Sequence, residues 1–163
     1  MTDSKPSKSA RKREHRALQE LGEKLIALND CERASLALDD KLEKAVRDAG
    51  QIKSRGALRR QKQLIGKLMR EVDPVPIRAE LAKLRADDVR AKRIFARSER
   101  WRDRIVSDGL IALDEFEAET GETDAELRAL LGELDVAFSE KAEKTVRRQI
   151  FRRVHEILVK ILG

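Results

Sequence analysis

Hydrophobic residues recur along this chain at intervals of three and four positions, which is the spacing of one face of an α-helix. The first apolar stripe contains Leu18, Leu21, Leu25 and Leu28, and Asn29-Asp30 is expected to end that helix. Similar stripes follow almost to the end of the chain. The pattern therefore predicts an all-α, multihelical protein with at least five helices and no sheet.

A second helix is expected after Asp39 or Asp40, because either side chain can cap a helix N-terminus. Gly50 marks a break after this helix, and further breaks are expected near Pro74 and Gly109. The apolar positions of the second helix are Leu42, Ala45, Val46 and Ala49.

The segment from Gln51 to Val72 combines one apolar face with one cationic face. At about 100° per residue, one direction is shared by its apolar side chains, which are Leu58, Ile65, Leu68, Met69 and Val72. The remaining arc carries Lys53, Arg55, Arg59, Arg60, Lys62, Lys67 and Arg70, and Glu71 is the only acid. A helix that only needs solubility usually alternates Glu with Lys. The uncompensated charge favours a nucleic-acid-binding face, and the alternative is a solvated face paired with acids of another helix.

Asp73-Pro74-Val75-Pro76 predicts a helix end followed by a new start, since proline fits the first turn of a helix but not its interior. The new helix is expected to run to about Val106. Its apolar positions are Ile77, Leu81, Leu84, Ala91, Phe95, Trp101 and Ile105. We expect Trp101 to be a core residue, although an aromatic ring can also stack on a base. Arg97, Arg100 and Arg104 in the second half are further candidate RNA contacts.

The charge reverses between residues 114 and 143, where eleven acids face two bases. This segment could repel RNA, bind a basic protein, or neutralise the Arg-rich helix within the fold, and we favour the last. Thr123 to Glu126 has the pattern of a capping box. The final helix is expected from about Ser139 to Leu162, with an apolar stripe of Val146, Ile150, Val154, Ile157 and Ile161. Arg147 and Arg148 belong to a third basic cluster.

These elements suggest three parts: a flexible basic arm over residues 1–10, an N-terminal helical subdomain over 11–73, and a C-terminal part over 74–163. The third part holds the long helix, which is expected to join two small helical subdomains. Leu58, Ile65, Leu68 and Ile150 are predicted core residues.

Composition adds a basic balance, with 36 Lys and Arg against 30 Asp and Glu, a net charge of +6 and a pI of about 9.6. Of the basic residues 22 are Arg, whose planar group suits phosphate and base contacts. A helix-forming role for Arg is the alternative explanation. His15, His155 and Cys31 are isolated, so we expect no catalytic site, metal site or cofactor. The chain has neither a secretory signal nor an apolar run long enough to span a membrane, which favours the cytoplasm.

The chain contains two distinctive motifs, Gln63-Leu64-Ile65-Gly66-Lys67 and Pro76-Ile77-Arg78. Further short motifs are Ser7-Lys8-Ser9, Leu21-Gly22, Ile52-Lys53, Gly56, Arg60-Gln61, Leu81, Lys83-Leu84, Arg102-Asp103-Arg104, Arg148-Gln149-Ile150-Phe151 and Leu158. Together these motifs resemble the DarP (YjgA) family of ribosome-associated proteins of proteobacteria. They cover nearly the whole chain in the family's order, and the first two are the most specific.

The resemblance implies an all-helical, non-enzymatic assembly factor that binds late precursors of the large (50S) ribosomal subunit. Its expected partners are large-subunit rRNA and precursor particles, with ribosomal proteins or other assembly factors as further candidates. Its expected role is to help the peptidyl transferase centre mature, and a monomer without membrane contact is the expected state. Two other classes fit the residues alone: a helical protein–protein adaptor and a DNA-associated helical protein.

Overall fold

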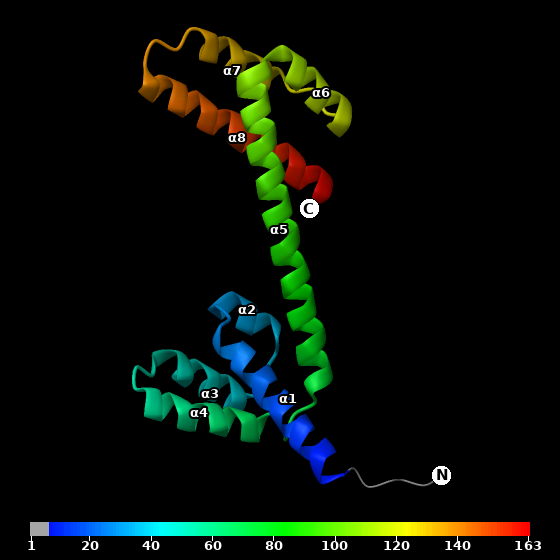
Figure 1. The fold of residues 1–163 in the computed structure, drawn as a ribbon, viewed down its shortest axis with the longest axis vertical. Helices are drawn as coiled ribbons and strands as arrows, with labels where there is room; N and C mark the ends of the chain where they lie inside the picture. The colour runs from blue at the N-terminus through cyan, green and yellow to red at the C-terminus, as the bar shows by residue number, and fades with distance from the viewer. Residues whose placement is uncertain (1–6) are drawn as a thin grey trace, which may run out of the picture. The chain divides into compact units, whose positions relative to one another are not determined.

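The computed structural model describes residues 7–163, and this part of the chain contains eight helices and no strand (Figure 1). The helices are α1 (Lys8–Ile26), α2 (Asp30–Ser35), α3 (Asp40–Gln51), α4 (Arg55–Leu68), α5 (Pro74–Asp108), α6 (Leu110–Thr120), α7 (Ala125–Asp135) and α8 (Glu140–Leu162). The predicted all-α class is confirmed. The expected breaks also occur, since α3 ends beside Gly50, α5 begins at Pro74 and Gly109 follows α5.

The chain divides into two compact units, residues 1–85 and 86–163. Helix α5 begins in the first unit and ends in the second. The subdomain boundary expected after residue 73 coincides with the start of α5 and stays a prediction. Of the expected N-terminal arm, residues 1–6 lie outside the described residues. The side chain of Ser7 caps α1 by accepting a hydrogen bond from the Ala10 amide, so this helix begins earlier than predicted.

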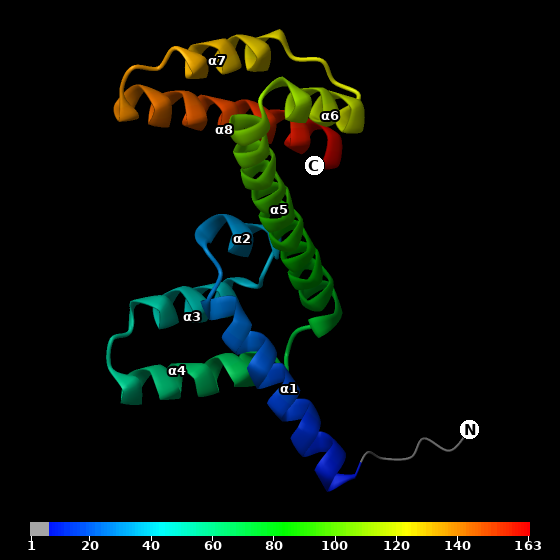
Figure 2. The same ribbon diagram turned by 45° about the horizontal axis from the view of Figure 1, so that its top comes forward.

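In the first unit, α3 and α4 lie side by side and α1 crosses them (Figure 2). Two glycines allow α1 and α4 to approach closely. A Cβ atom on Gly22 would lie 2.6 Å from Cγ2 of Ile65, and one on Gly66 would lie 3.4 Å from Cβ of Gln19. Ile65 is fully buried, and the four predicted apolar positions of α3 are buried as well. Leu58 and Leu68 are only partly buried at the margin of this core.

The sequence prediction missed α2 and misread Asn29. Asn29 starts a helix instead of ending one, because its side chain accepts a hydrogen bond from the Glu32 amide at 2.9 Å. The Glu32 carboxylate accepts one from the Asn29 amide at 2.8 Å. Helix α1 has already ended at Ile26, and Leu28 packs against the core from the connection.

The second unit packs the last part of α5 with α6, α7 and α8. Trp101 is buried as predicted and meets Phe116 edge-on, with ring centroids 5.2 Å apart. Ile150 is fully buried, which agrees with its predicted core role.

Three local predictions in this unit are wrong. On α5, Ile94 is buried, whereas Ala91 and Phe95 are exposed, because the apolar face turns by one residue. On α8, Leu158 is buried and Ile161 is exposed. The cap of α7 is Asp124 instead of Thr123, since Asp124 accepts hydrogen bonds from two amides of the first turn.

Candidate nucleic-acid interface

Helix α4 carries most of the cationic face that the sequence predicts, whereas Lys53 precedes this helix and Arg70 follows it. Residues 51–70 contain seven Lys and Arg and no acid. Ile65 and Met69 anchor the helix in the core. The basic side chains that remain exposed are Lys53, Arg55, Arg59, Arg60, Lys67 and Arg70. At about 100° per residue, Arg60 and Lys67 project about 140–160° away from Ile65, so both point to solvent.

Lys62 differs from its neighbours because it takes part in helix packing. Its ammonium group donates a hydrogen bond of 2.8 Å to the Glu23 carboxylate of α1. This bond lowers the pKa of Glu23 below the ordinary value of 4.5. The other six candidates on this segment have no carboxylate oxygen within 4.0 Å among residues 7–163. Their charges are therefore available to an anionic partner.

In the second unit, three of the five predicted RNA contacts are neutralised by acids. Arg97 pairs with Glu119 and Arg104 with Glu115, both on α6, and Arg147 pairs with Glu143 at 2.7 Å. The Arg104 guanidinium also lies 4.8 Å from the centre of the Trp101 ring. Arg100 and Arg148 are exposed, and the described residues offer them no carboxylate partner.

The acidic segment pairs with other basic residues as well. Asp124 accepts a hydrogen bond of 2.7 Å from Arg153, and Glu122 accepts one of 2.8 Å from Lys160. Arg128 donates to Asp114 at 2.8 Å. The Arg128 contact lies within the segment, whereas the contacts with Arg153 and Lys160 of α8 support the interpretation that the segment neutralises a basic helix of its own unit.

The net charges of the two compact units differ in the same direction as their ion pairs. Residues 1–85 contain 21 Lys and Arg and 13 Asp and Glu, a net charge of +8. Residues 86–163 contain 15 basic and 17 acidic residues, a net charge of −2. The positive charge of the protein therefore comes from the first unit, which carries α4.

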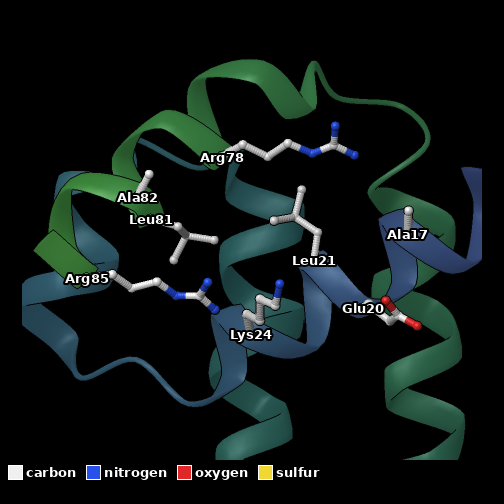
Figure 3. A pocket seen from close by; sticks show the side chains of 8 residues that line it. All are labelled: Ala17, Glu20, Leu21, Lys24, Arg78, Leu81, Ala82 and Arg85. Atoms are coloured by element: carbon white, nitrogen blue, oxygen red, sulfur yellow. The ribbon is translucent and has the colours of Figure 1, made fainter.

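A cleft in the first unit contains basic residues that sequence reasoning did not name as contacts. It has a volume of about 280 Å³ and lies between α1 and the start of α5. Lys24, Arg78 and Arg85 line it around Leu21 and Leu81 (Figure 3). Arg78 and Arg85 lie three and four residues from Leu81, so the helical periodicity of the sequence puts both beside the apolar stripe of this helix. Their convergence with Lys24 depends on how α1 and α5 pack, which the pattern does not contain.

The isolated histidine and cysteine residues do not form a metal cluster in the described part of the chain. The ring nitrogen Nδ1 of His155 lies 3.0 Å from the Ser98 hydroxyl, and the ring stacks on Phe151. Cys31 is exposed. Among residues 7–163, none of the helices combines the length and hydrophobicity that crossing a membrane requires.

Comparisons with known proteins give one consistent result. A family model described as dual-action ribosomal maturation protein DarP matches residues 4–155. Proteins with this name include one from Thiobacillus denitrificans, 41% identical over 155 residues, which cover 94% of this chain and 87% of the relative. One from Nitrosomonas europaea is 38% identical over 163 residues, 99% of this chain and 91% of the relative. One from Chromobacterium violaceum is 37% identical over 153 residues, 93% of this chain and 84% of the relative.

Proposed function

The chain belongs to the DarP family of ribosomal maturation proteins, and on this premise we propose that it binds late precursors of the large (50S) ribosomal subunit through their rRNA. In this proposal it promotes maturation of the peptidyl transferase centre by binding alone, without catalysis. It acts in the cytoplasm as a monomer, and ribosomal proteins or other assembly factors are further candidate partners.

The observation that carries the RNA-binding proposal is the exposed cationic face of α4 and its flanks, with six basic residues that lack acidic partners within residues 7–163. Proteins recognise A-form RNA mainly through its shape, phosphates and 2′-hydroxyl groups. A basic helix therefore needs no sequence-reading motif. Arg100 and Arg148 are secondary contacts, and Arg97, Arg104 and Arg147 are weaker ones because each already has an acidic partner.

Binding alone is sufficient for the proposed maturation role. A protein that binds one rRNA arrangement more tightly than another shifts the population towards the first. A surface fixed on a packed helix suits this task, because contacts with several phosphates form together only when those phosphates have the right spacing.

The test is sedimentation of a cell lysate on a sucrose gradient, with the wild type and the Arg59→Glu, Arg60→Glu, Lys67→Glu variant. We expect the wild type in the large-subunit peak and the variant at the top of the gradient, with the same helical circular dichroism spectrum. A control with Lys41→Glu, Lys44→Glu and Lys141→Glu makes the same charge change at exposed sites on α3 and α8, and it should sediment like the wild type.

Two results contradict the proposal at different levels. If the wild type sediments with no ribosomal particle, the function is wrong. If the α4 variant sediments as strongly as the wild type, α4 is not the contact, and the basic residues of α5 and α8 become the candidates. Higher affinity for duplex DNA than for rRNA would favour a DNA-associated protein.

One observation favours a protein-binding adaptor as the second candidate. The connection between α7 and α8 holds Phe138, which is 100% exposed, and Val136, which is 61% exposed. Glu133 and Asp135 lie next to them in sequence and have no ion-pair partner in the described part of the chain. A basic protein with an apolar pocket could bind this connection, with the pocket around Phe138 and the basic groups beside Glu133 and Asp135. Stable co-purification of one protein, with no effect of salt on RNA association, would support the adaptor.

A further inference from the structure

The cleft between α1 and the start of α5 concentrates positive charge in the first unit. Three basic side chains line it, Lys24 from α1 and Arg78 and Arg85 from α5. Figure 3 shows Lys24 and Arg85 reaching toward each other from the two helices, with Leu21 and Leu81 beside them. Arg78 extends from α5 along the other side of the cleft.

Among residues 7–163, no acid pairs with these three cations, because none of them has a carboxylate oxygen within 4.0 Å. Glu20 also lines the cleft, but its carboxylate accepts a hydrogen bond of 3.0 Å from Arg16, another residue of α1. Like charges that share a cleft repel one another. An anion in the cleft would relieve this repulsion, so the charge pattern points to an anionic ligand.

The floor of the cleft narrows the choice of anion. Leu21 and Leu81 are only 5% and 7% exposed, and the other apolar lining residues are Ala17 and Ala82. The two leucines therefore offer an acidic peptide little accessible surface, and the lining has no aromatic ring on which a base could stack. The selective contacts must come from the charged rim. Arginine forms two parallel hydrogen bonds to phosphate, which makes this rim suited to a phosphodiester backbone.

We propose that this cleft is a second binding site for the RNA phosphodiester backbone, separate from the α4 face. The inference rests on the proposed function, because it assumes that the chain binds RNA. Arg78 and Arg85 are seven residues apart, about 10 Å along the α5 axis, so each can bind a different phosphate of one strand. Lys24 adds a contact from the opposite wall.

The two sites use different faces of α1. Arg55 and Arg59 of α4 also line a groove whose α1 residues are Gln19 and Glu23. The cleft beside α5 is lined instead by Ala17, Glu20, Leu21 and Lys24 of α1. Since the two sets share no residue, the contributions of the sites can be measured separately. The first unit would then bind RNA on both sides of α1.

The experiment measures RNA affinity by fluorescence anisotropy across a salt series for the full chain. The test variant is Lys24→Gln, Arg78→Gln, Arg85→Gln, and the matched control is Lys41→Gln, Lys44→Gln, Lys141→Gln. The slope of log affinity against log salt reports the phosphate contacts, at about 0.7–0.9 per contact. We expect the slope of the test variant to be shallower by about 2–3 and that of the control to be unchanged. All six side chains are exposed, so the melting temperature should not fall.

Further variants separate the cleft from the proposed function. Arg78→Lys with Arg85→Lys keeps the charges and should retain most of the wild-type slope. Combining the cleft variant with Arg59→Gln, Arg60→Gln and Lys67→Gln should add the two losses of slope.

Three outcomes would contradict the proposal. An unchanged slope in the cleft variant, with a loss of slope in the α4 variant, overturns the cleft as an RNA site and leaves the proposed function intact. No salt-dependent RNA affinity in the wild type overturns both. Loss of sedimentation with ribosomal particles, but full RNA affinity, would assign the cleft to an acidic protein segment instead.

Discussion

The basic face of α4 and the basic residues of the second unit carry the same kinds of side chain in different electrostatic surroundings. On α4 and its flanks six cations face solvent, and residues 51–70 contain no acid. In the second unit α6 supplies Glu115 and Glu119 to α5, and the unit carries a net charge of −2. A count of arginines would favour the second unit, which has eleven against four in residues 51–70, whereas the ion pairs favour the α4 face as the region open to an anion.

The difference matters because a paired arginine must leave its carboxylate before it can bind a phosphate. An exposed ion pair contributes only about 0–1 kcal/mol, so the exchange is possible, but the displaced acid then stays close to the phosphate and repels it. An unpaired arginine has neither cost. The comparison therefore predicts that RNA contacts concentrate in the first unit.

The largest effect should come from removing the residue that anchors α4. Ile65 is fully buried against Gly22, so Ile65→Ala should lower the free energy of unfolding by about 2–5 kcal/mol. Leu64→Ala is the matched control, because Leu64 is the preceding residue and is 44% exposed. Thermal and denaturant unfolding measure both. Equal stabilities of the two variants would show that the apolar face of α4 is assigned incorrectly.

A smaller effect is expected where α1 crosses α4. A Cβ atom on Gly22 would lie 2.6 Å from Ile65, so Gly22→Ala should destabilise the first unit by about 1–3 kcal/mol through overpacking. Gly132 lies inside α7 with no atom within 4 Å of an added Cβ. Gly132→Ala should therefore stabilise the protein by up to about 1 kcal/mol, since alanine favours helix. Denaturant unfolding should show shifts of opposite sign, and a stabilising Gly22→Ala would contradict the close packing.

The close contact at Gly22 shows which features of the fold a sequence pattern cannot predict. Periodicity predicted the stripe of α3 and most of the stripe of α8, apart from Leu158 and Ile161, because each stripe depends on one helix alone. It did not predict the contact of Gly22 with Ile65, which depends on how two helices cross. It also placed Phe95 instead of Ile94 in the core, because adjacent apolar residues fit one period almost equally well and the packing partners decide between them.

The candidate site also has a part that the sequence predicts and a part that depends on how helices pack. The α4 face was predictable because its charge and its missing acids are local features of residues 51–70. The pairing of Arg97 with Glu119 joins residues 22 positions apart, so the sequence offered it only as one of three interpretations of the acidic segment. The cleft around Lys24 was missed for the same reason. Its cations come from two helices that are distant in sequence.

The two regions can be compared directly in RNA binding. One variant removes unpaired charges with Arg59→Gln, Arg60→Gln and Lys67→Gln, and the other removes paired charges with Arg97→Gln, Arg104→Gln and Arg147→Gln. We expect the first to make the salt slope shallower by about 2–3 and the second by less than about 1. The melting temperature should fall only in the second, which loses ion pairs. Equal losses of slope would remove the distinction between the regions.

Removing the acids should make the second unit resemble the first. Glu115→Gln, Glu119→Gln and Glu143→Gln free the three paired arginines. The salt slope should become steeper by about 1, because only some of the freed side chains can reach a phosphate. Anisotropy titrations across a salt series measure this change. A weaker affinity for RNA would instead mean that these acids hold the arginines in their binding positions.

The smallest effect concerns Lys62, the cation of the α4 segment that pairs with an acid, Glu23 of α1. The hydrogen bond from Lys62 lowers the pKa of Glu23 below 4.5. The stability from this pair is therefore complete above pH 4.5 and is lost as the pH falls through the lowered folded value. Because both side chains are about one-third exposed, solvent limits the contribution to about 1 kcal/mol at most.

Thermal unfolding of the wild type and Glu23→Gln should thus differ slightly at neutral pH and converge in acid. Lys62→Gln should cause a similar loss, and the double variant should lose less than the sum because the two residues act as a pair. In RNA titrations, Glu23→Gln frees the ammonium group and should steepen the salt slope by at most about 1. A stability difference that persists in acid would mean that Glu23 stabilises α1 by packing, and that its charge does not hold Lys62.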